Sequence, residues 1–464
     1  MKRVLLAWLV LLGANSAAWA QPWSLPSDEA IRAILADRID NRKQSVGIVV
    51  GIVSPQGRRV ISHGQPARSD SRPLDGRTVF EIGSVTKVFN ALLLADMAVR
   101  KEIALDDPVA KYLPANVRVP ERAGKQITLQ DLATHTSGLP RLPNNMPTKD
   151  PLNPYADYTS DQLYQFLGGY TLTRDIGSQF EYSNLGAGLL GNALSRRARR
   201  PYEVLIRERI TARLGMRDTA ITLTPSMRAR FAVGHDAALK PVPYWDLPTL
   251  AGSGALRSTA NDLLIMLENE TGLRRSAIRA AMDRQLSTRR PGASSDTEIA
   301  LGWQVRKHAI GTIFFHSGGT GGFRTFVAFN PQTREGVVAL ANASTPVGVD
   351  DIGMHILVGE KLADPRPPVT HTEVALDRAD KEKLVGRYRL SANSVLTMTL
   401  EGEQLFAQVA KLPKDRVFAA SPTLLFWRGE DGDIRFELGP DGRAMSAIVR
   451  FNGRETVAKR EDAS

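Results

Sequence analysis

The sequence predicts an α/β protein: an antiparallel sheet flanked by helices, with a helical subdomain, followed by a small all-β C-terminal domain. Strand patterns occur near the start of the chain and return after residue 300, while the stretch between them is mainly helical. One antiparallel sheet, closed by both ends of this region, accounts for that order. After a proline-rich stretch near residue 365, short strands alternate with turn signals, which indicates a separate β-domain.

The first twenty residues have the features of a secretory signal peptide. Lys2 and Arg3 precede an apolar run from Val4 to Gly13, and Ala18-Trp19-Ala20 is a small-residue cleavage pattern. We therefore expect cleavage after Ala20 and a periplasmic or secreted mature protein. No later segment reaches the roughly 18 uninterrupted apolar residues of a membrane helix, so no integral membrane segment is expected after cleavage.

Composition excludes several classes of function. The chain of 464 residues has no cysteine, which rules out disulfides, thiolate metal sites and cysteine nucleophiles. Its histidines lack the spacing of zinc hydrolases, so neither a metal nor another cofactor is expected. The formal net charge is +11, but no basic stretch is interleaved with aromatic residues, and no nucleic-acid partner is predicted.

The elements of the first domain are expected in a clear order. A helix from Ala30 to Asp37 precedes a hairpin with strands from Val46 to Val53 and from Arg58 to Ser62. Helical periodicity follows over residues 84–97, 182–196, 202–214, 260–267 and 276–286. Late strands are predicted over residues 302–306, 312–315, 323–329 and 336–341, before a helix that carries Ile352, Ile356 and Leu357.

The domain boundaries follow from the change of pattern. We expect the signal peptide over residues 1–20, the first domain over 21–362, a stiff proline-rich linker over 363–376 and the β-domain over 377–464. Strands of the β-domain are predicted over residues 395–400, 405–409, 423–427, 433–438 and 445–451, separated in part by Glu401-Gly402, Asp431-Gly432, Asp441-Gly442 and Asn452-Gly453. This pattern fits a meander or a barrel.

Ser84 and Lys87 stand three positions apart where the first long helix begins. By itself this pair is most simply a helix-capping serine beside a solvated lysine. A buried lysine could instead lose its proton near neutral pH and activate the serine as a nucleophile. A second polar motif in the chain is needed to decide between the two interpretations.

Two later stretches supply candidate partners. Glu181-Tyr182-Ser183-Asn184 opens a helix, and residues 315–323 read FHSGGTGGF between two predicted strands. We interpret the second stretch as a glycine-rich loop. It lacks the G-x-G-x-x-G spacing and leads into a strand rather than a helix, so phosphate binding is not expected.

Together these motifs resemble those of the serine β-lactamase and penicillin-binding protein superfamily. The matching residues are Ser84-Val85-Thr86-Lys87, Tyr182-Ser183-Asn184 and His316-Ser317-Gly318. The Y-x-N form is similar to that of class C β-lactamases and their DD-carboxypeptidase, D-aminopeptidase and esterase relatives. The resemblance runs in order over residues 25–362 and implies the β-lactamase/transpeptidase-like fold.

The resemblance implies a role for each matched residue. Ser84 would be the acylated nucleophile, and Lys87 and Tyr182 would share the general-base work. Asn184 would bind the acylamide side chain of the substrate and help to position Lys87. The backbone N–H groups of Ser84 and Gly319 would form the oxyanion hole. His316, Ser317 and Gly318 would line the strand edge that meets the substrate carboxylate.

The sequence departs from the class C pattern at two positions. His316 replaces the usual lysine of K-T-G, and Ser344 stands where many class C enzymes have an asparagine that contacts the β-lactam carboxylate. Imidazole has an ordinary pKa near ~6.5, so a fixed positive charge at this position is not expected. Both changes, and the appended β-domain, resemble DD-carboxypeptidases, D-aminopeptidases and esterases more than dedicated β-lactamases.

The predicted function is therefore an exported serine hydrolase acting through a Ser84 acyl-enzyme. Its substrates would be β-lactams, D-Ala-D-Ala-type peptides of peptidoglycan, or both. A carboxylesterase or D-aminopeptidase of the same fold, and a slowly deacylating penicillin-binding sensor, are the alternatives. The sequence leaves the oligomeric state open.

Overall fold

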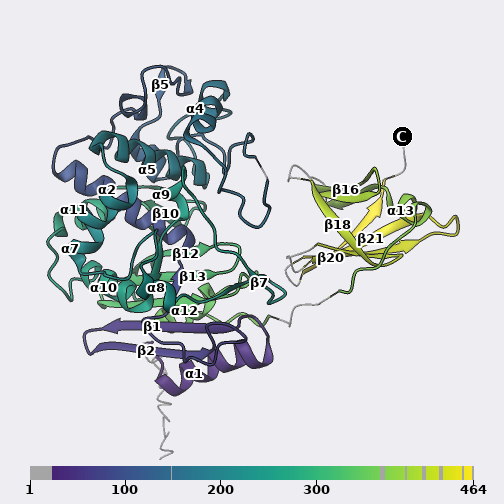
Figure 1. Cartoon of the computed structure of the whole chain (residues 1–464), viewed down its shortest axis with the longest axis horizontal. Helices are drawn as coiled ribbons and strands as arrows, with labels where there is room; N and C mark the ends of the chain where they lie inside the picture. The colour runs from purple at the N-terminus through teal and green to yellow at the C-terminus, as the bar shows by residue number, and fades with distance from the viewer. Residues whose placement is uncertain are drawn as a thin grey trace, which may run out of the picture.

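The computed structural model describes residues 23–147, 149–365, 371–391, 394–409, 414–427, 432–451 and 454–461. The predicted signal peptide lies outside these residues, as do residues 366–370 of the predicted linker and the turn signals at Asp431 and at Asn452-Gly453. The chain forms a larger body of sheet and helices and a smaller β-barrel, drawn in yellow in Figure 1.

The larger body contains an eight-stranded antiparallel sheet of order β2-β1-β14-β13-β12-β11-β10-β9. Its strands are β1 (Gly47–Ser54), β2 (Gly57–Gly64), β9 (Arg289–Pro291), β10 (Thr297–Ala300), β11 (Gln304–His308), β12 (Gly311–Gly319), β13 (Arg324–Asn330) and β14 (Glu335–Ala341). The early hairpin pairs with the last strand, with Val50 opposite Ala339. This confirms the predicted sheet, closed by both ends of the domain, although β9 and β10 were not foreseen.

Helices cover both faces of this sheet, and β1 is therefore buried on both sides. Ile48 and Val50 join one core cluster with Ile31 of α1 (Asp28–Ala36) and Ile352 of α12 (Asp350–Val358). Val49, one residue along and therefore on the opposite face, joins a second cluster with α2 (Thr86–Val99) and α10 (Ala260–Glu270). The almost continuous apolar run of β1 is the sequence signature of that two-sided burial.

The helical subdomain lies beyond α2, at the top of Figure 1 around α4 and α5. The remaining helices of the body are α3 (Leu129–Ala133), α4 (Ser160–Gly169), α5 (Asn184–Ala198), α6 (Tyr202–Ile206), α7 (Ala212–Leu214), α8 (Pro225–Ala229), α9 (Ala251–Gly254) and α11 (Arg279–Ser287). The segment predicted as one helix over residues 202–214 changes to π-helix at Arg207–Thr211. Short strand pairs are β3 (Val79–Glu81) with β8 (Arg257–Thr259), β4 (Glu121–Arg122) with β5 (Lys125–Gln126), and β6 (Gly234–His235) with β7 (Pro241–Val242).

The C-terminal domain is a closed eight-stranded barrel that begins with α13 (Arg378–Leu384). Its strands are β15 (Gly386–Ser391), β16 (Ser394–Glu401), β17 (Gln404–Val409), β18 (Asp415–Ser421), β19 (Leu424–Phe426), β20 (Gly432–Leu438), β21 (Ala444–Phe451) and β22 (Arg454–Arg460). Tyr388 pairs with Arg460 where the first and last strands close the barrel. The predicted all-β domain is confirmed, whereas β15, β18 and β22 were missed.

One buried carboxyl group makes stability depend on pH. Among the described residues, neither carboxylate oxygen of Glu270 has a hydrogen-bond partner, and burial raises the pKa of this group to about 8. An unfolded chain releases the proton near the ordinary glutamate pKa. The folded state therefore loses stability as pH rises from about 4.5 towards 8.

Replacing Glu270 with glutamine should remove this loss, because the amide has similar size and no proton to release. We expect the variant to melt about 3 °C or more above the wild type at pH 8, with a smaller difference at pH 5. Thermal unfolding at both pH values measures this. Glu268→Gln, on the same helix but paired with Arg58, is the control. A Glu270→Gln difference that did not grow with pH would contradict the prediction.

Candidate active site

Ser84 lies in a single 3-10 turn, Gly83–Val85, directly before α2. The N-cap residue of α2 is Val85, with no side-chain capping bond, so the interpretation of Ser84 as a helix cap is wrong. Lys87 is only 3% exposed, so it is not a solvated lysine either. The structure thus favours the chemical interpretation of this pair.

Three oxygen atoms surround the amine of Lys87. Its Nζ lies 3.0 Å from Ser84 Oγ, 2.9 Å from Asn184 Oδ1 and 2.6 Å from the Ser253 carbonyl oxygen. Burial holds the pKa of Lys87 well below its ordinary value, and the charge of Arg141 lowers it further. A neutral amine can donate its two N–H bonds to Asn184 and Ser253. Its lone pair then faces the hydroxyl of Ser84 and can accept that proton.

Tyr182 stands against the same two residues. Lys87 Nζ lies 4.8 Å from the centre of the Tyr182 ring, and the guanidinium of Arg141 lies 5.2 Å from it. Desolvation raises the pKa of Tyr182 to about 12, although a hydrogen bond to Ser84 and the charge of Arg141 act in the opposite direction. The phenol therefore carries its proton at neutral pH, and Lys87 is the better resting base.

His135 fixes the loop that presents Tyr182. The backbone N–H of Ser183 donates to His135 Nδ1 at 3.1 Å, and that of Glu181 donates to the His135 carbonyl at 2.8 Å. The ring of His135 lies 4.5 Å from that of Tyr182, centre to centre. His135 adopts φ +58°, a left-handed conformation uncommon for residues other than glycine. Its contacts are those of a structural residue.

The third motif lies in a strand and not in a loop as predicted. His316, Ser317, Gly318 and Gly319 continue β12 and pair with β13. Backbone contact explains the glycines, because a Cβ atom at Gly318 would lie 2.1 Å from the Ile82 carbonyl oxygen. The end of β12 thereby packs directly against the backbone that precedes Ser84, which only glycine permits.

His316 does not supply a positive charge. Burial lowers its pKa to about 3, and the nearby Lys87 acts in the same direction. Its Nδ1 lies 2.7 Å from the Ser317 carbonyl oxygen and, in the neutral ring, carries the proton donated to it. The expected loss of the fixed charge of K-T-G at this position is therefore supported by the electrostatics of the site.

The predicted site residues other than the buried Lys87 line one cleft of about 1320 Å³. Ser84, Tyr182, Asn184 and residues 316–319 border it, together with Arg141, Tyr155, Trp245, Arg324 and Asp350 of the same body. His371, Thr372, Glu373, Phe426 and Trp427, from the C-terminal part of the chain, also border it. The sequence motifs did not predict Arg141 or Asp350 as residues of this cleft. Arg141 directly follows Ser137-Gly138-Leu139-Pro140, and this position near the family-like segment could have indicated it. No sequence pattern marks Asp350.

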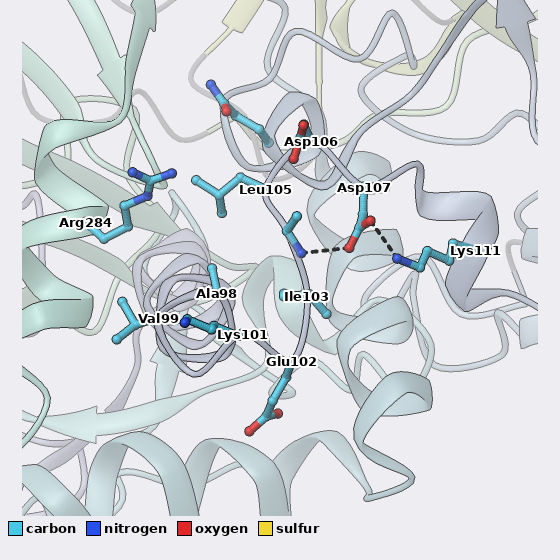
Figure 2. A pocket seen from close by; sticks show the side chains of 12 residues that line it. Ala98, Val99, Lys101, Glu102, Ile103, Leu105, Asp106, Asp107, Lys111 and Arg284 are labelled. Atoms are coloured by element: carbon cyan, nitrogen blue, oxygen red, sulfur yellow. Dashed lines mark hydrogen bonds and ion pairs between the residues drawn. The ribbon is translucent and has the colours of Figure 1, made fainter.

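A second cavity of about 840 Å³ lies beside the C-terminal end of α2, and Figure 2 shows its lining. Its polar side chains are mainly charged groups. Asp107 accepts hydrogen bonds from Lys111 and from the backbone N–H of Ala104, which lowers its pKa to about 2. These contacts stabilise a loop, and no hydroxyl nucleophile lines this cavity.

Comparison with known proteins identifies the family of this chain. The family model described as Beta-lactamase matches residues 29–360. The chain belongs to the Beta-lactamase family. A second model, described as a domain of unknown function (DUF3471), matches residues 370–460, which include the barrel.

Relatives of this family member include peptidases and penicillin-binding proteins. It is 31% identical over 366 residues to the D-alanyl-D-alanine-carboxypeptidase/endopeptidase AmpH of Escherichia coli K12, covering 74% of this chain and 92% of that protein. It is 25% identical over 442 residues to penicillin-binding protein 4* of Bacillus subtilis, covering 88% and 94%. The crystal structure of a β-lactamase/D-alanine carboxypeptidase from Yersinia pestis superposes with a TM-score of 0.60 at 28% identity, covering 69% and 93%.

These similarities confirm the superfamily, its class C-like branch and the predicted fold. The chain is a serine hydrolase of this family. Across the residues that the structure describes, none of the helices combines the length and apolar character needed to span a membrane.

Replacing Arg141 with methionine should move the acidic limb of the pH profile of kcat/KM to higher pH. The Arg141 charge disfavours protonated Lys87, so its removal raises the lysine pKa and the free amine forms only at higher pH. We expect a shift of about half a pH unit or more. Profiles from pH 5 to 9 with any substrate that acylates Ser84 measure it.

Lys240→Met is the matched control, because it removes a positive charge from the same cleft, and Lys240 is not among the groups that lower the pKa of Lys87. Its profile should superimpose on that of the wild type. An Arg141→Met profile that also did so would contradict the role given to this guanidinium.

Proposed function

We propose that the chain is an exported hydrolase that cleaves β-lactams, D-Ala-D-Ala-type peptides, or both, through an acyl-enzyme on Ser84. The observation that carries this proposal is the position of the buried Lys87 amine, 3.0 Å from Ser84 Oγ and held by Asn184 and Ser253. We place the signal peptide at residues 1–20, the catalytic domain at 21–362, the linker at 363–376 and the barrel domain at 377–464.

Acylation begins when Ser84 Oγ bonds to the carbonyl carbon of the substrate and its proton passes to Lys87 Nζ. The scissile C–N or C–O bond then breaks, and the leaving atom takes a proton relayed through the Tyr182 hydroxyl. In deacylation a water molecule adds to the ester, gives up a proton along the same path, and releases the acid and the free Ser84 hydroxyl. No charge accumulates on the enzyme over the cycle.

The developing oxyanion would be bound by the backbone N–H groups of Ser84 and Gly319. Each such preorganised donor is typically worth about 3 kcal/mol in the transition state. The close packing of the β12 backbone on residues 82–83 supports this assignment, because it brings the Gly319 backbone next to the turn that holds Ser84. Asn184 would bind the acylamide group, and residues 316–318 would form the adjoining strand edge.

The names of the relatives support these substrate classes. AmpH of E. coli is named a D-alanyl-D-alanine-carboxypeptidase/endopeptidase, and the protein of Lysobacter lactamgenus that is 26% identical is named a β-lactamase. A β-lactam and a D-Ala-D-Ala peptide both present an acyl group next to a carboxylate, so one site can accept either.

The neutral His316 favours a second candidate, a carboxylesterase or D-aminopeptidase. Without a cation at that position, a substrate carboxylate loses one attraction that K-T-G enzymes provide, whereas a neutral ester loses nothing. A sensor that is acylated and hardly deacylated is the third candidate.

Mass spectrometry with benzylpenicillin tests the nucleophile. We expect one covalent adduct per chain on wild-type protein, located on the peptide that contains Ser84, and none on Ser84→Ala. Ser178→Ala, which changes a serine with an exposed side chain, is the control and should be labelled like the wild type. An adduct that survived in Ser84→Ala would overturn the proposal.

Turnover of three substrate types separates the candidate functions. A chromogenic cephalosporin, an acyl-D-Ala-D-Ala peptide and a short-chain aryl ester should be compared by kcat/KM on the mature protein, with D-alanine p-nitroanilide added for D-aminopeptidase activity. The proposal predicts that the cephalosporin or the peptide is hydrolysed in a Ser84-dependent manner. Hydrolysis of only the ester or the anilide would favour the second candidate, and acylation without steady-state turnover would identify a sensor.

A further inference from the structure

An acidic side chain lies at the strand edge where the carboxylate of a substrate is expected. Asp350, the first residue of α12, borders the same cleft as Ser84 and Ser317. The hydroxyl of Ser317 donates a hydrogen bond to Asp350 Oδ2. Neither the family resemblance nor the motif pattern assigns a function to this aspartate.

The Ser317 hydroxyl has only one proton, and Asp350 already accepts it. For Ser317 to bind a substrate carboxylate, that proton would have to turn away from Asp350. Two carboxylates would then share the site, and like charges at close range disfavour each other. His316 cannot compensate, because it is neutral.

The other charged groups around Asp350 leave this conflict in place. Arg324 of β13 attracts the Asp350 carboxylate and offsets part of its charge, and its guanidinium also donates to the carbonyl oxygens of Thr320, Phe323 and Ser344. Asp351 adds a second negative charge and is paired with Arg38, which lies in the turn directly after α1. Burial, partly offset by Ser317, raises the pKa of Asp350 to about 6, so the group is ionised at neutral pH.

We propose that Asp350 is a specificity-determining residue that disfavours substrates with a carboxylate at this edge and favours those with a neutral or cationic group there. The inference rests on the proposed function, since it concerns the acyl-enzyme site at Ser84. The carboxylate-bearing substrates of the proposed function are then hydrolysed less efficiently than analogues with the same acyl group in which that carboxylate is replaced by a neutral or cationic group.

A matched pair of aryl esters tests this inference. Both carry the same acyl-D-alanyl group; one leaving group is 3-carboxyphenol and the other is 3-carbamoylphenol, which differ mainly in charge. The quantity measured is the ratio of kcat/KM for the carboxylate ester to that for the carbamoyl ester. The general-base chemistry of Lys87 and Tyr182 is common to both esters and cancels in this ratio.

Asp350→Asn should raise this ratio about tenfold or more at pH 7.5, because the amide keeps the size and removes the charge. In the wild type the ratio should fall as pH rises from 5 to 7.5, since Asp350 is protonated below its pKa and charged above it. In Asp350→Asn the ratio should not depend on pH in this interval. The wild-type pH series tests the inference even if the variant fails to fold.

Asp236→Asn is the matched control, because it removes one negative charge from the same cleft at a residue that binds the backbone N–H groups of Ala238 and Lys240. Its ratio should stay within about twofold of the wild type. A ratio that is unchanged or lowered in Asp350→Asn, or a wild-type ratio independent of pH, would overturn the inference while both esters are still hydrolysed. Absence of Ser84-dependent hydrolysis of either ester would overturn the proposed function as well.

Discussion

The candidate site is arranged around the buried amine of Lys87. A protonated lysine is costly to bury without a paired charge, and Lys87 is held by Ser84, Asn184 and the Ser253 carbonyl, none of which is an acid. The neutral amine satisfies both of its N–H bonds there and keeps a lone pair for Ser84. Since Asn184 begins α5 and Ser253 lies in α9, the packing of these helices against α2 sets the geometry around Ser84 and Lys87.

The same environment determines the charge of its neighbours. Desolvation that lowers the pKa of Lys87 also lowers that of His316 and raises that of Tyr182. Burial thus shifts all three groups, which are arranged around a hydroxyl, towards their uncharged forms. Proton transfer among neutral groups does not require a buried ion in the resting enzyme. The ordinarily charged side chains that border the cleft include Arg141, Asp236, Lys240, Arg324 and Asp350.

Residues of the C-terminal domain also form part of the wall of this cleft. Phe426 and Trp427, with the segment of residues 371–373, border the cleft that contains Ser84. His371 contacts Asp433 of β20, which Arg450 of β21 also binds, so the start of this segment is attached to the barrel wall. The match to penicillin-binding protein 4* of B. subtilis covers 88% of this chain, so it includes part of the region after residue 362.

The sequence by itself determined the broad architecture and the three motifs. Apolar periodicity indicated β1 and α2, and the order Ser84, Tyr182, His316 identified the superfamily, because these patterns are local and each survives in a short stretch of chain. The sequence pattern indicated a loop for the third motif, because consecutive glycines usually indicate turns. Gly318 and Gly319 belong to β12 instead, where Gly318 packs closely against the backbone of Ile82.

Only the tertiary structure decided the protonation states and the surroundings of the motifs. Whether Lys87 is solvated or buried depends on α5 and α9, far away in the chain, and no local pattern reports it. Ser253 acts through a backbone carbonyl that any residue could supply, and Asp350 looks like an ordinary first residue of a helix. Residue type can be read from a sequence, but desolvation and proximity, which set pKa values and selectivity, arise only when distant segments pack together.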